Sequence, residues 1–542
     1  MFIKLPERKI VSTEIKPVVP VQKLQLQNML PESFALTWSQ FAFSLFASSL
    51  FVIFCYLPVA DSATWQAISE AEFHNVEQQT AVLPFAAGMR FIPIGQSGKQ
   101  VAAFLFGAGG AQYVGLGFTI LQFLAFGLWA YLLYRIKSSR WSLLAVAAIM
   151  LMCLVQLDGF HTGVFGQICG ALLILSRLTK SADGIAARWS ESSWLRWAAV
   201  FLIMAAWANL DASFVLGLGG LCLLVVSKFW ETLQQTGQLS KTFACREFQK
   251  RVWILELGFL ATLFTPQGIR LWESLFWWQN NPIVSSLRLG EPASLFSWTT
   301  LAIAIGWGIW VVNALRAKRC RLSTSMMLLA TSSTILVCLS PQFVFWFVAA
   351  MAVVTLDLLP VKSTADDKLL TETENENSNG SSETSDSTGS IKFAFTLLTG
   401  LAIWLAFCFS PFGTKLLGGK ERTEKQIVGR QLPIEGKQFL ENNRVKLLHC
   451  PVYWSDWLSA GTAQPMMVNS GPHNTPNIVN FDYQEIFDGR SDWRALADKY
   501  ALTGLLVDKA NQQRLIRNLR RRPGQWQLVH EDSQCILYRR SL

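Results

Sequence analysis

Apolar residues dominate the chain in long runs, and short polar or charged segments separate these runs. A helix needs about 20 apolar residues to cross the hydrocarbon core of a bilayer, so runs of this length predict membrane spans. The pattern predicts eleven spans, and tight turns between some of them leave the count open by one or two. In chain order the predicted spans are 38–58, 113–134, 141–157, 162–178, 194–210, 212–229, 252–268, 297–315, 323–340, 342–360 and 392–410.

The pattern changes near the end of the chain. Residues 361–391 are acidic, polar and rich in Ser and Asn, which predicts a disordered cytoplasmic linker that cannot form a core. Residues 411–542 alternate strand-like runs such as "TGLLVDK" with amphipathic stretches such as "NQQRLIRNLRR", which predicts a small α/β domain. The predicted fold class is therefore a mainly α membrane protein, with a helical bundle over 38–360, a last span and this domain.

Composition and charge agree with a membrane protein and indicate its orientation. Hydrophobic residues make up 51% of the chain and charged residues only 15%, against about a quarter in soluble domains. The net charge of +10 does not indicate nucleic-acid binding, because Lys and Arg lie in short loops rather than in one basic domain. If residues 1–37 are cytoplasmic, the inside segments hold 24 Lys and Arg, and the outside loops before residue 392 hold four. The positive-inside rule then places residues 411–542 outside.

Familiar catalytic and metal motifs are missing from the sequence. There is no GxGxxG, GxxxxGK[ST], HExxH or GxSxG pattern, which leaves nucleotide-binding, ATPase, zinc-protease and serine-hydrolase functions without support. The ten Cys show no CxxC or Cys/His metal spacing, and pairing of Cys450 with Cys535 depends on an oxidising compartment. No cofactor is predicted. A divalent ion at Asp61 and Asp158 is conceivable, but two acids without defined geometry do not support one.

Polar residues gather at the predicted outer ends of the spans. Asp61 follows the first span, Asp158 and His161 lie between the third and fourth, Asp211 between the fifth and sixth, and Glu291 after the seventh. Ionisable residues at membrane depth are costly, so their convergence on one side predicts an outward-facing site. A simpler interpretation stays open for each residue, since an acid before a helix is often a cap and a lone His is often structural.

This set suits glycosyl transfer. A carboxylate beside a water-filled cavity can accept the proton of an acceptor hydroxyl while that hydroxyl attacks a sugar carbon. If the sugar is carried on a lipid phosphate, the leaving group is anionic and needs nearby cations. The outside loops of the membrane half offer four, namely Arg90, Lys99, Arg270 and Arg288.

The acids of the C-terminal part predict no second site. Asp456 and Asp532 are expected to be surface or turn residues. Trp454 and Trp457 are expected in a core, with a sugar-stacking platform as the alternative.

Several stretches, in this order, carry a resemblance to a known superfamily. They are Asp61 after the first span, "LPFAAGMRFIP" (83–93), "WANLDASFVLG" (207–217), "FTPQGIRLWESL" (264–275), "GEPASLFS" (290–297), "YWSDWLSAG" (453–461), "FDGRSDW" (487–493), "DKYALTGLLVDK" (498–509) and "WQLVHEDSQCILYRR" (526–540). From about residue 38 onward the chain resembles bacterial membrane proteins of the GT-C glycosyltransferase superfamily, in the dolichyl-phosphate-mannose-transferase-like and RgtA/B/C/D-like group.

The resemblance implies a GT-C fold in a bacterial inner membrane and a polyprenyl-phosphate-sugar donor. It implies that the acid of the first outer loop, here Asp61, is the general base and that Asp158 assists. His161, Asp211, Glu291, Arg90, Lys99 and Arg270 are the expected substrate-binding residues. The acceptor would be a glycan, lipid or protein.

The chain departs from the superfamily pattern at several positions. Asp211-Ala212 stands where relatives have His-Gly, and Thr265 and Glu291-Pro292 replace an Asn and a Glu-Trp. These changes favour an alternative function as a non-catalytic glycan- or lipid-binding scaffold. A transporter is a third alternative, although the polar residues lie at span ends rather than at mid-membrane depth.

Overall fold

The structure is a computed structural model of the 542-residue chain. It describes residues 36–60, 62–72, 81–86, 94–136, 140–156, 163–178, 193–277, 297–316, 323–358, 384–420, 422–429, 431–460, 462, 464–471, 475–490, 492–521 and 523–541.

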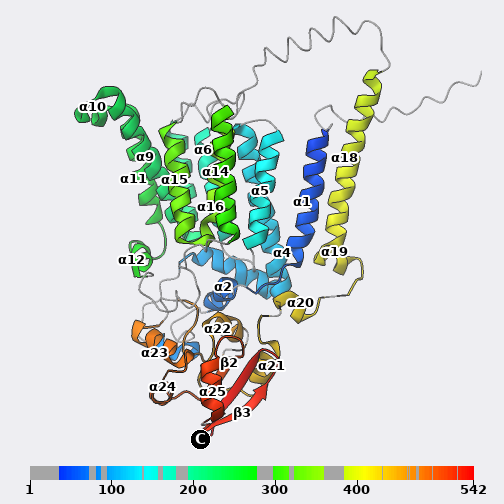
Figure 1. Ribbon diagram of the computed structural model, residues 1–542, viewed down its shortest axis with the longest axis vertical. Coiled ribbons are helices and arrows are strands. Elements are labelled where there is room, and N and C mark those ends of the chain that lie inside the picture. Colours follow the sequence, from blue (N-terminus) through cyan, green and yellow to red (C-terminus); the bar gives the residue numbers. More distant parts are fainter. Residues whose placement is uncertain are drawn as a thin grey trace, which may run out of the picture.

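A bundle of long helices forms one end of the molecule, and a smaller part built around a sheet forms the other (Figure 1). The bundle is built from α1 (Trp38–Tyr56), α4 (Gln96–Ile136), α5 (Arg140–Gln156), α6 (Gly163–Leu178), α8 (Ser193–Leu210), α9 (Phe214–Thr236), α11 (Arg246–Thr262), α14 (Trp298–Arg316), α15 (Thr324–Leu339), α16 (Val344–Leu358) and α18 (Thr384–Phe409). Short helices join or flank them: α2 (Ser62–Glu72), η3 (Pro84–Ala86), α10 (Leu239–Ala244), α12 (Arg270–Trp277), η5 (Pro341–Phe343), α19 (Pro411–Leu416) and α20 (Glu424–Val428).

The bundle confirms a mainly helical membrane protein but not the expected eleven spans. Among the described residues, five helices are long and apolar enough to cross a membrane, and five more are apolar but shorter. Helix α11, which lies where the span 252–268 is expected, falls in neither group because its first turns carry charged residues. Helix α18 begins at Thr384, so residues 384–391 of the expected linker are helical, whereas 361–383 lie outside the described residues.

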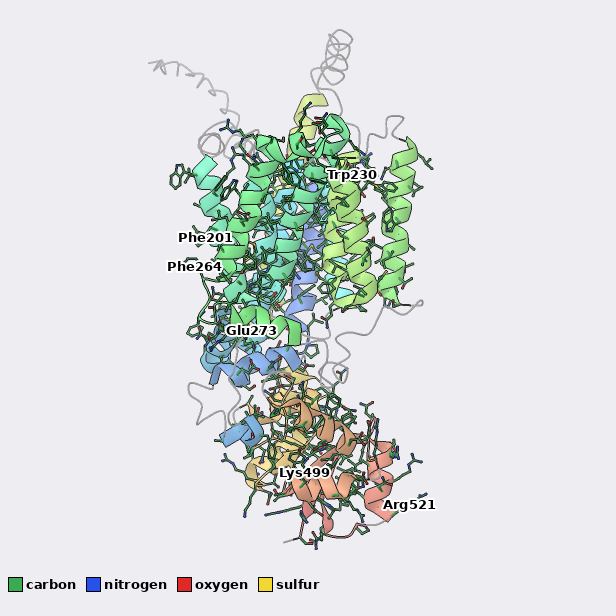
Figure 2. The ribbon with its side chains drawn as sticks, turned by 90° about the vertical axis from the view of Figure 1, so that its left-hand side faces the viewer. Phe201, Trp230, Phe264, Glu273, Lys499 and Arg521 are labelled. Atoms are coloured by element: carbon green, nitrogen blue, oxygen red, sulfur yellow. The ribbon has the colours of Figure 1, made fainter. Side chains whose placement is uncertain are left out.

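The outward faces of the bundle are apolar. Trp230 is 50% exposed and Phe264 67% (both are labelled in Figure 2), and many other large apolar side chains of the bundle are exposed as well. Exposed apolar surface of this extent is unfavourable in water but suits contact with lipid. The bundle thus presents lipid-facing sides, as the apolar runs predict.

Two glycines set the path of α4. At Gly110, where φ is +67°, the helix is interrupted in a backbone region that favours glycine, so its first turns run in a different direction from its second half. Gly98 lies in those first turns and packs closely on the end of α8: a Cβ there would lie 2.3 Å from the carbonyl oxygen of Leu210. The predicted span 113–134 corresponds to the second half of α4 alone.

The C-terminal part contains a four-stranded sheet with the order β1-β2-β4-β3. Its strands are β1 (Leu448–His449), β2 (Gly504–Asp508), β3 (Trp526–Glu531) and β4 (Cys535–Arg540). The helices around it are α21 (Ile434–Asn442), α22 (Val452–Ser459), α23 (Asn477–Phe487), α24 (Trp493–Lys499) and α25 (Gln513–Arg521). The apolar stretch 465–468 forms no strand of the sheet, because Met466 makes only an isolated bridge with Leu448.

The two faces of this sheet belong to different cores. Cys535 and Leu537 of β4 join the core that continues into the bundle. Ile536 and Tyr538 join a second core, which the C-terminal helices share. Alternation along β4 therefore sends neighbouring residues of one strand into two different cores.

We predict that Gly98→Ala destabilises the protein by about 1–3 kcal/mol, because the new methyl group must displace backbone where α4 meets α8. Gly107→Ala in the same helix is the matched control, since nothing lies within 4 Å of a Cβ built there. Thermal unfolding in detergent measures both. Equal melting temperatures for the two variants would contradict the close approach.

Candidate functional site

The structure describes three of the predicted site residues, Lys99, Asp211 and Arg270. Each lies at the end of the bundle that faces the C-terminal part, in α4, after α8 and in α12. The other predicted site residues lie outside the described part of the chain: Asp61, Arg90, Asp158, His161 and Glu291.

Helix α2 lies between the bundle and the C-terminal part (Figure 1). Its Glu70 is buried and forms an ion pair with Lys99 in the first turns of α4. The second carboxylate oxygen of Glu70 accepts a hydrogen bond from the Gln66 amide at 2.7 Å. The charge of Lys99 is thus balanced inside the protein by an acid one helix away.

The neighbouring residue of α2 faces the other half of the molecule. The Ser69 hydroxyl donates to Asp456 Oδ1 of α22 at 3.1 Å, and the backbone N–H of Ser470 donates to Oδ2 at 3.0 Å. Asp456 is only 2% exposed. Burial, together with the negative charge of Glu70, raises the pKa of this carboxyl to about 6.

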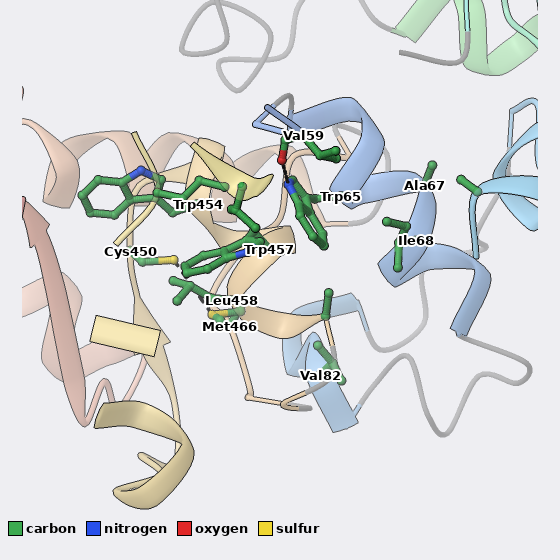
Figure 3. Close-up of a cluster of buried hydrophobic side chains, with 14 of the residues drawn as sticks. Val59, Trp65, Ala67, Ile68, Val82, Cys450, Trp454, Trp457, Leu458 and Met466 are labelled. Carbon is green, nitrogen blue, oxygen red and sulfur yellow. Dashed lines mark hydrogen bonds between the residues drawn. The ribbon is translucent and has the colours of Figure 1, made fainter. Parts of the chain in front are cut away.

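Apolar side chains surround these polar contacts. Trp65 and Ile68 of α2 pack in one buried cluster with Trp454 and Trp457 of α22 (Figure 3). The Trp65 indole N–H donates to the carbonyl oxygen of Val59 at 2.8 Å, so its one polar group is satisfied in the core. The same cluster reaches into α4 and α6 of the bundle, which makes α2 a shared core element of both halves.

Backbone contacts join the same regions of the chain. The N–H of Val59 donates to the carbonyl oxygen of Ile427, and the N–H of Met466 donates to that of Val82, each at 2.8 Å. The segments on both sides of α2 are therefore held against the C-terminal part.

Asp211 lies at the turn between α8 and α9 and is 8% exposed. Its carboxylate accepts hydrogen bonds from the backbone N–H of Ser213, at 3.0 Å, and from the Ser213 hydroxyl. The Trp207 indole in turn donates to that hydroxyl at 3.0 Å. These contacts agree with the simpler interpretation of Asp211 as a residue that orders the start of a helix.

The structure brings two of the predicted residues to one corner. Gly95, with φ at +65°, packs against Leu210 and Asp211, and its carbonyl oxygen accepts the backbone N–H of Lys99 at 3.1 Å. Arg270 does not share these contacts. It is exposed at the start of α12, where the indole N–H of Trp272 donates to Thr262 Oγ1 at 3.1 Å.

Sequence reasoning misplaced one acid. Asp456 is not a surface or turn residue but a buried helical one, because its partners come from α2 and from Ser470. In "YWSDWLSAG" Asp456 stands between Trp454 and Trp457, a neighbourhood that could have indicated its burial. Both Trp side chains are buried, which confirms that they belong to a core. Cys450 and Cys535 are both free thiols.

No protein-family model matches the chain, and no curated protein matches its sequence. Among solved structures it is similar to an oligosaccharyltransferase of Archaeoglobus fulgidus tethered with an acceptor peptide, with a TM-score of 0.50, 11% identity and coverage of 93% of this chain and 74% of that chain. It is also similar to ArnT from Cupriavidus metallidurans bound to undecaprenyl phosphate, with a TM-score of 0.43, 13% identity and coverage of 92% and 97%. Both are GT-C membrane glycosyltransferases, and the likeness to the archaeal protein confirms a GT-C-like fold but not the expected number of spans.

We predict that Asp456 makes the stability of the protein depend on pH. Its folded-state pKa of about 6 lies above the unfolded value, so its stabilisation is complete below about pH 4 and is lost as the pH rises through 6. Between pH 4 and pH 8 the wild type should lose about 2–3 kcal/mol more than Asp456→Asn. Thermal unfolding across this range measures the difference, and parallel profiles would contradict it.

Asp482→Asn is a control whose effect on stability should depend on pH in the opposite direction from that of Asp456→Asn. Burial opposes ionisation of Asp482, but hydrogen bonds from Lys499 and Tyr500 outweigh it and lower its pKa. Its stabilisation is therefore present at neutral pH and is lost as the pH falls.

We predict that removing only one charge of the Glu70–Lys99 ion pair lowers the free energy of unfolding more than removing both. Lys99→Met removes the cation beside a buried carboxylate and is expected to cost about 3–5 kcal/mol. The double variant Glu70→Gln with Lys99→Met removes both charges and should recover most of this loss. Denaturant unfolding of the single and double variants tests the coupling, and additive effects would refute it.

Proposed function

We propose that this chain is a membrane glycosyltransferase, which moves a sugar from a polyprenyl-phosphate donor to an envelope glycan, lipid or protein at the outer membrane face. The observation that carries this proposal is the fold shared with the archaeal oligosaccharyltransferase over 93% of the chain. The proposed location is the bacterial inner membrane, with a cytoplasmic N-terminus and residues 411–542 outside.

The position of α2 and of the side chains packed on it, which we call the α2 layer, supports a reaction at the outer membrane face. It lies between a bundle with lipid-facing sides and a part that does not contain such helices among its described residues. A lipid-linked donor reaches this layer from the membrane, and a polar acceptor reaches it from water. Asp61 directly precedes Ser62, the first residue of α2, so the proposed base is bonded to the element that both halves hold.

In the proposed reaction Asp61 accepts the proton of the acceptor hydroxyl. The acceptor oxygen then forms a bond to the anomeric carbon, and the bond between that carbon and the phosphate oxygen breaks. The lipid phosphate leaves with the electron pair, and the proposed cations Arg90 and Arg270 offset its charge. Asp158 assists the base, and His161, Asp211 and Glu291 contact the substrates. Lys99 acts within its pair with Glu70 rather than as an isolated cation.

A non-catalytic scaffold is the second candidate. One observation favours it: Lys99 and Asp211, two predicted substrate-binding residues, already have partners inside the protein. Such a scaffold would bind a glycan or lipid in the same layer without transferring it.

We predict that wild-type protein in lipid transfers label from a panel of radiolabelled polyprenyl-phosphate sugars to an envelope acceptor fraction. Asp61→Asn should abolish transfer while donor binding and the melting temperature stay at wild-type values, because the amide cannot accept the proton. Asp357→Asn, at the end of α16, is a matched control of the same chemistry. Donor binding without transfer by the wild type would favour the scaffold, and transfer by Asp61→Asn would refute the role of Asp61.

A further inference from the structure

The last hairpin of the chain brings together three side chains that commonly bind metals. Strands β3 and β4 pair antiparallel, and residues 532–534 connect them. His530 lies near the end of β3, Asp532 in the connection and Cys535 at the start of β4. Within the described part of the chain this is the one group of such residues whose ligand atoms all lie within 4.8 Å of one another.

An irregularity in β3 places His530 on the same face as Cys535. Leu528 pairs with Tyr538, but His530 pairs with Leu537, so the register shifts by one residue between them. Paired residues share a face, and Leu537 shares its face with Cys535 two positions away. In a regular hairpin His530 would pair with Ile536 and lie on the opposite face.

The two distances from Asp532 suit a tetrahedral ion. Asp532 Oδ2 lies 3.2 Å from Cys535 Sγ and 3.5 Å from His530 Nε2. A zinc ion with bonds of about 2.0 Å to N and O and 2.3 Å to S holds such ligand pairs about 3.3–3.6 Å apart. Two of the three ligand-atom separations therefore match those around a zinc ion, and all three atoms lie within 4.8 Å of one another.

The surroundings orient the ligands. The other oxygen of Asp532, Oδ1, accepts the backbone N–H groups of Gln534 and Cys535, each at 2.7 Å, which leaves Oδ2 turned toward the sulfur and the imidazole. Burial opposes ionisation of Asp532, but its hydrogen bonds, those from Cys535 and Gln534 foremost, outweigh burial and lower the pKa of the carboxyl.

The imidazole of His530 is stacked on Phe439 of α21, with ring centroids 5.0 Å apart. Its Nε2 is buried and faces Asp532 Oδ2 at 3.5 Å, beyond a good hydrogen-bond length, so a cation between the two atoms would satisfy both. The His530 side chain as a whole is 20% exposed and that of Asp532 only 4%, so the group lies at the edge of the core.

We propose that His530, Asp532 and Cys535 bind a zinc-type divalent cation, with water as the fourth ligand. Imidazole, thiolate and carboxylate together favour zinc over magnesium or calcium, which prefer oxygen ligands alone. The group lies in the terminal hairpin of the sheet, so the site stabilises the C-terminal part and takes no share in the proposed transfer at α2.

One contact opposes metal binding. Burial and the charge of Asp532 raise the pKa of the Cys535 thiol, which donates to Asp532 Oδ2. The ion must displace this proton, as it does in other thiolate sites. The metal-free hairpin is therefore held by its own hydrogen bond, and the test has to distinguish the metal-bound from the metal-free state.

The test uses full-length protein in detergent, stripped with a chelator and titrated with Co²⁺, which replaces zinc and gives absorption bands for thiolate ligation and for tetrahedral geometry. We expect one equivalent of Co²⁺ per chain and its displacement by Zn²⁺. Cys535→Ser should lose the thiolate band, and His530→Gln should weaken binding at least tenfold. Cys450→Ser, at a second buried thiol of the same part, is the matched control and should keep both bands.

His530→Gln also guards against misfolding, because His530 is partly exposed and its replacement keeps a polar side chain. Zn²⁺ should raise the melting temperature of the wild type but not of this variant, and the two metal-free proteins should melt alike. Absence of a thiolate band at one equivalent, or a band unchanged in Cys535→Ser or His530→Gln, would overturn the proposal.

Discussion

The structure depends on the double attachment of one short helix. Two consecutive residues of α2 make polar contacts in opposite directions, Ser69 to Asp456 and Glu70 to Lys99. Two of these four side chains are buried acids, which are stable inside a protein only when hydrogen bonds or an opposite charge compensate them. The position of α2 is therefore fixed from both sides, and with it the position of the C-terminal part relative to the bundle.

This arrangement explains how one chain can pass from lipid to water without a loose hinge. The bundle exposes apolar side chains outward, and near α2 the Trp residues of α2 and α22 pack in one core with side chains of α4 and α6. Polar groups inside this layer, such as the Trp65 indole and the Asp456 carboxylate, find their partners within it. A layer of this kind is rigid, because moving it would leave several buried groups without partners.

Local pattern was enough to predict part of this fold. The long apolar runs predicted most helices of the bundle, and the strand-like run "TGLLVDK" predicted β2. The burial of Asp456 was beyond prediction, since its partner Ser69 lies 387 positions away. The register shift between Leu528 and His530 could not be predicted either, because it arises in the pairing of β3 with β4 and not in the composition of β3. Sequence reasoning placed Asp211 correctly at a turn, but only the structure shows that Ser213 takes up its carboxylate.

The distance along the chain between Ser69 and Asp456 has a consequence for how the protein is made. A ribosome adds roughly 5–20 residues per second, so the 387 positions between them take about 20–80 s to synthesise. Throughout that interval the nascent chain holds Trp65 and Ile68 without the Trp residues that later cover them. Completion of this core must therefore wait until α22 has been synthesised.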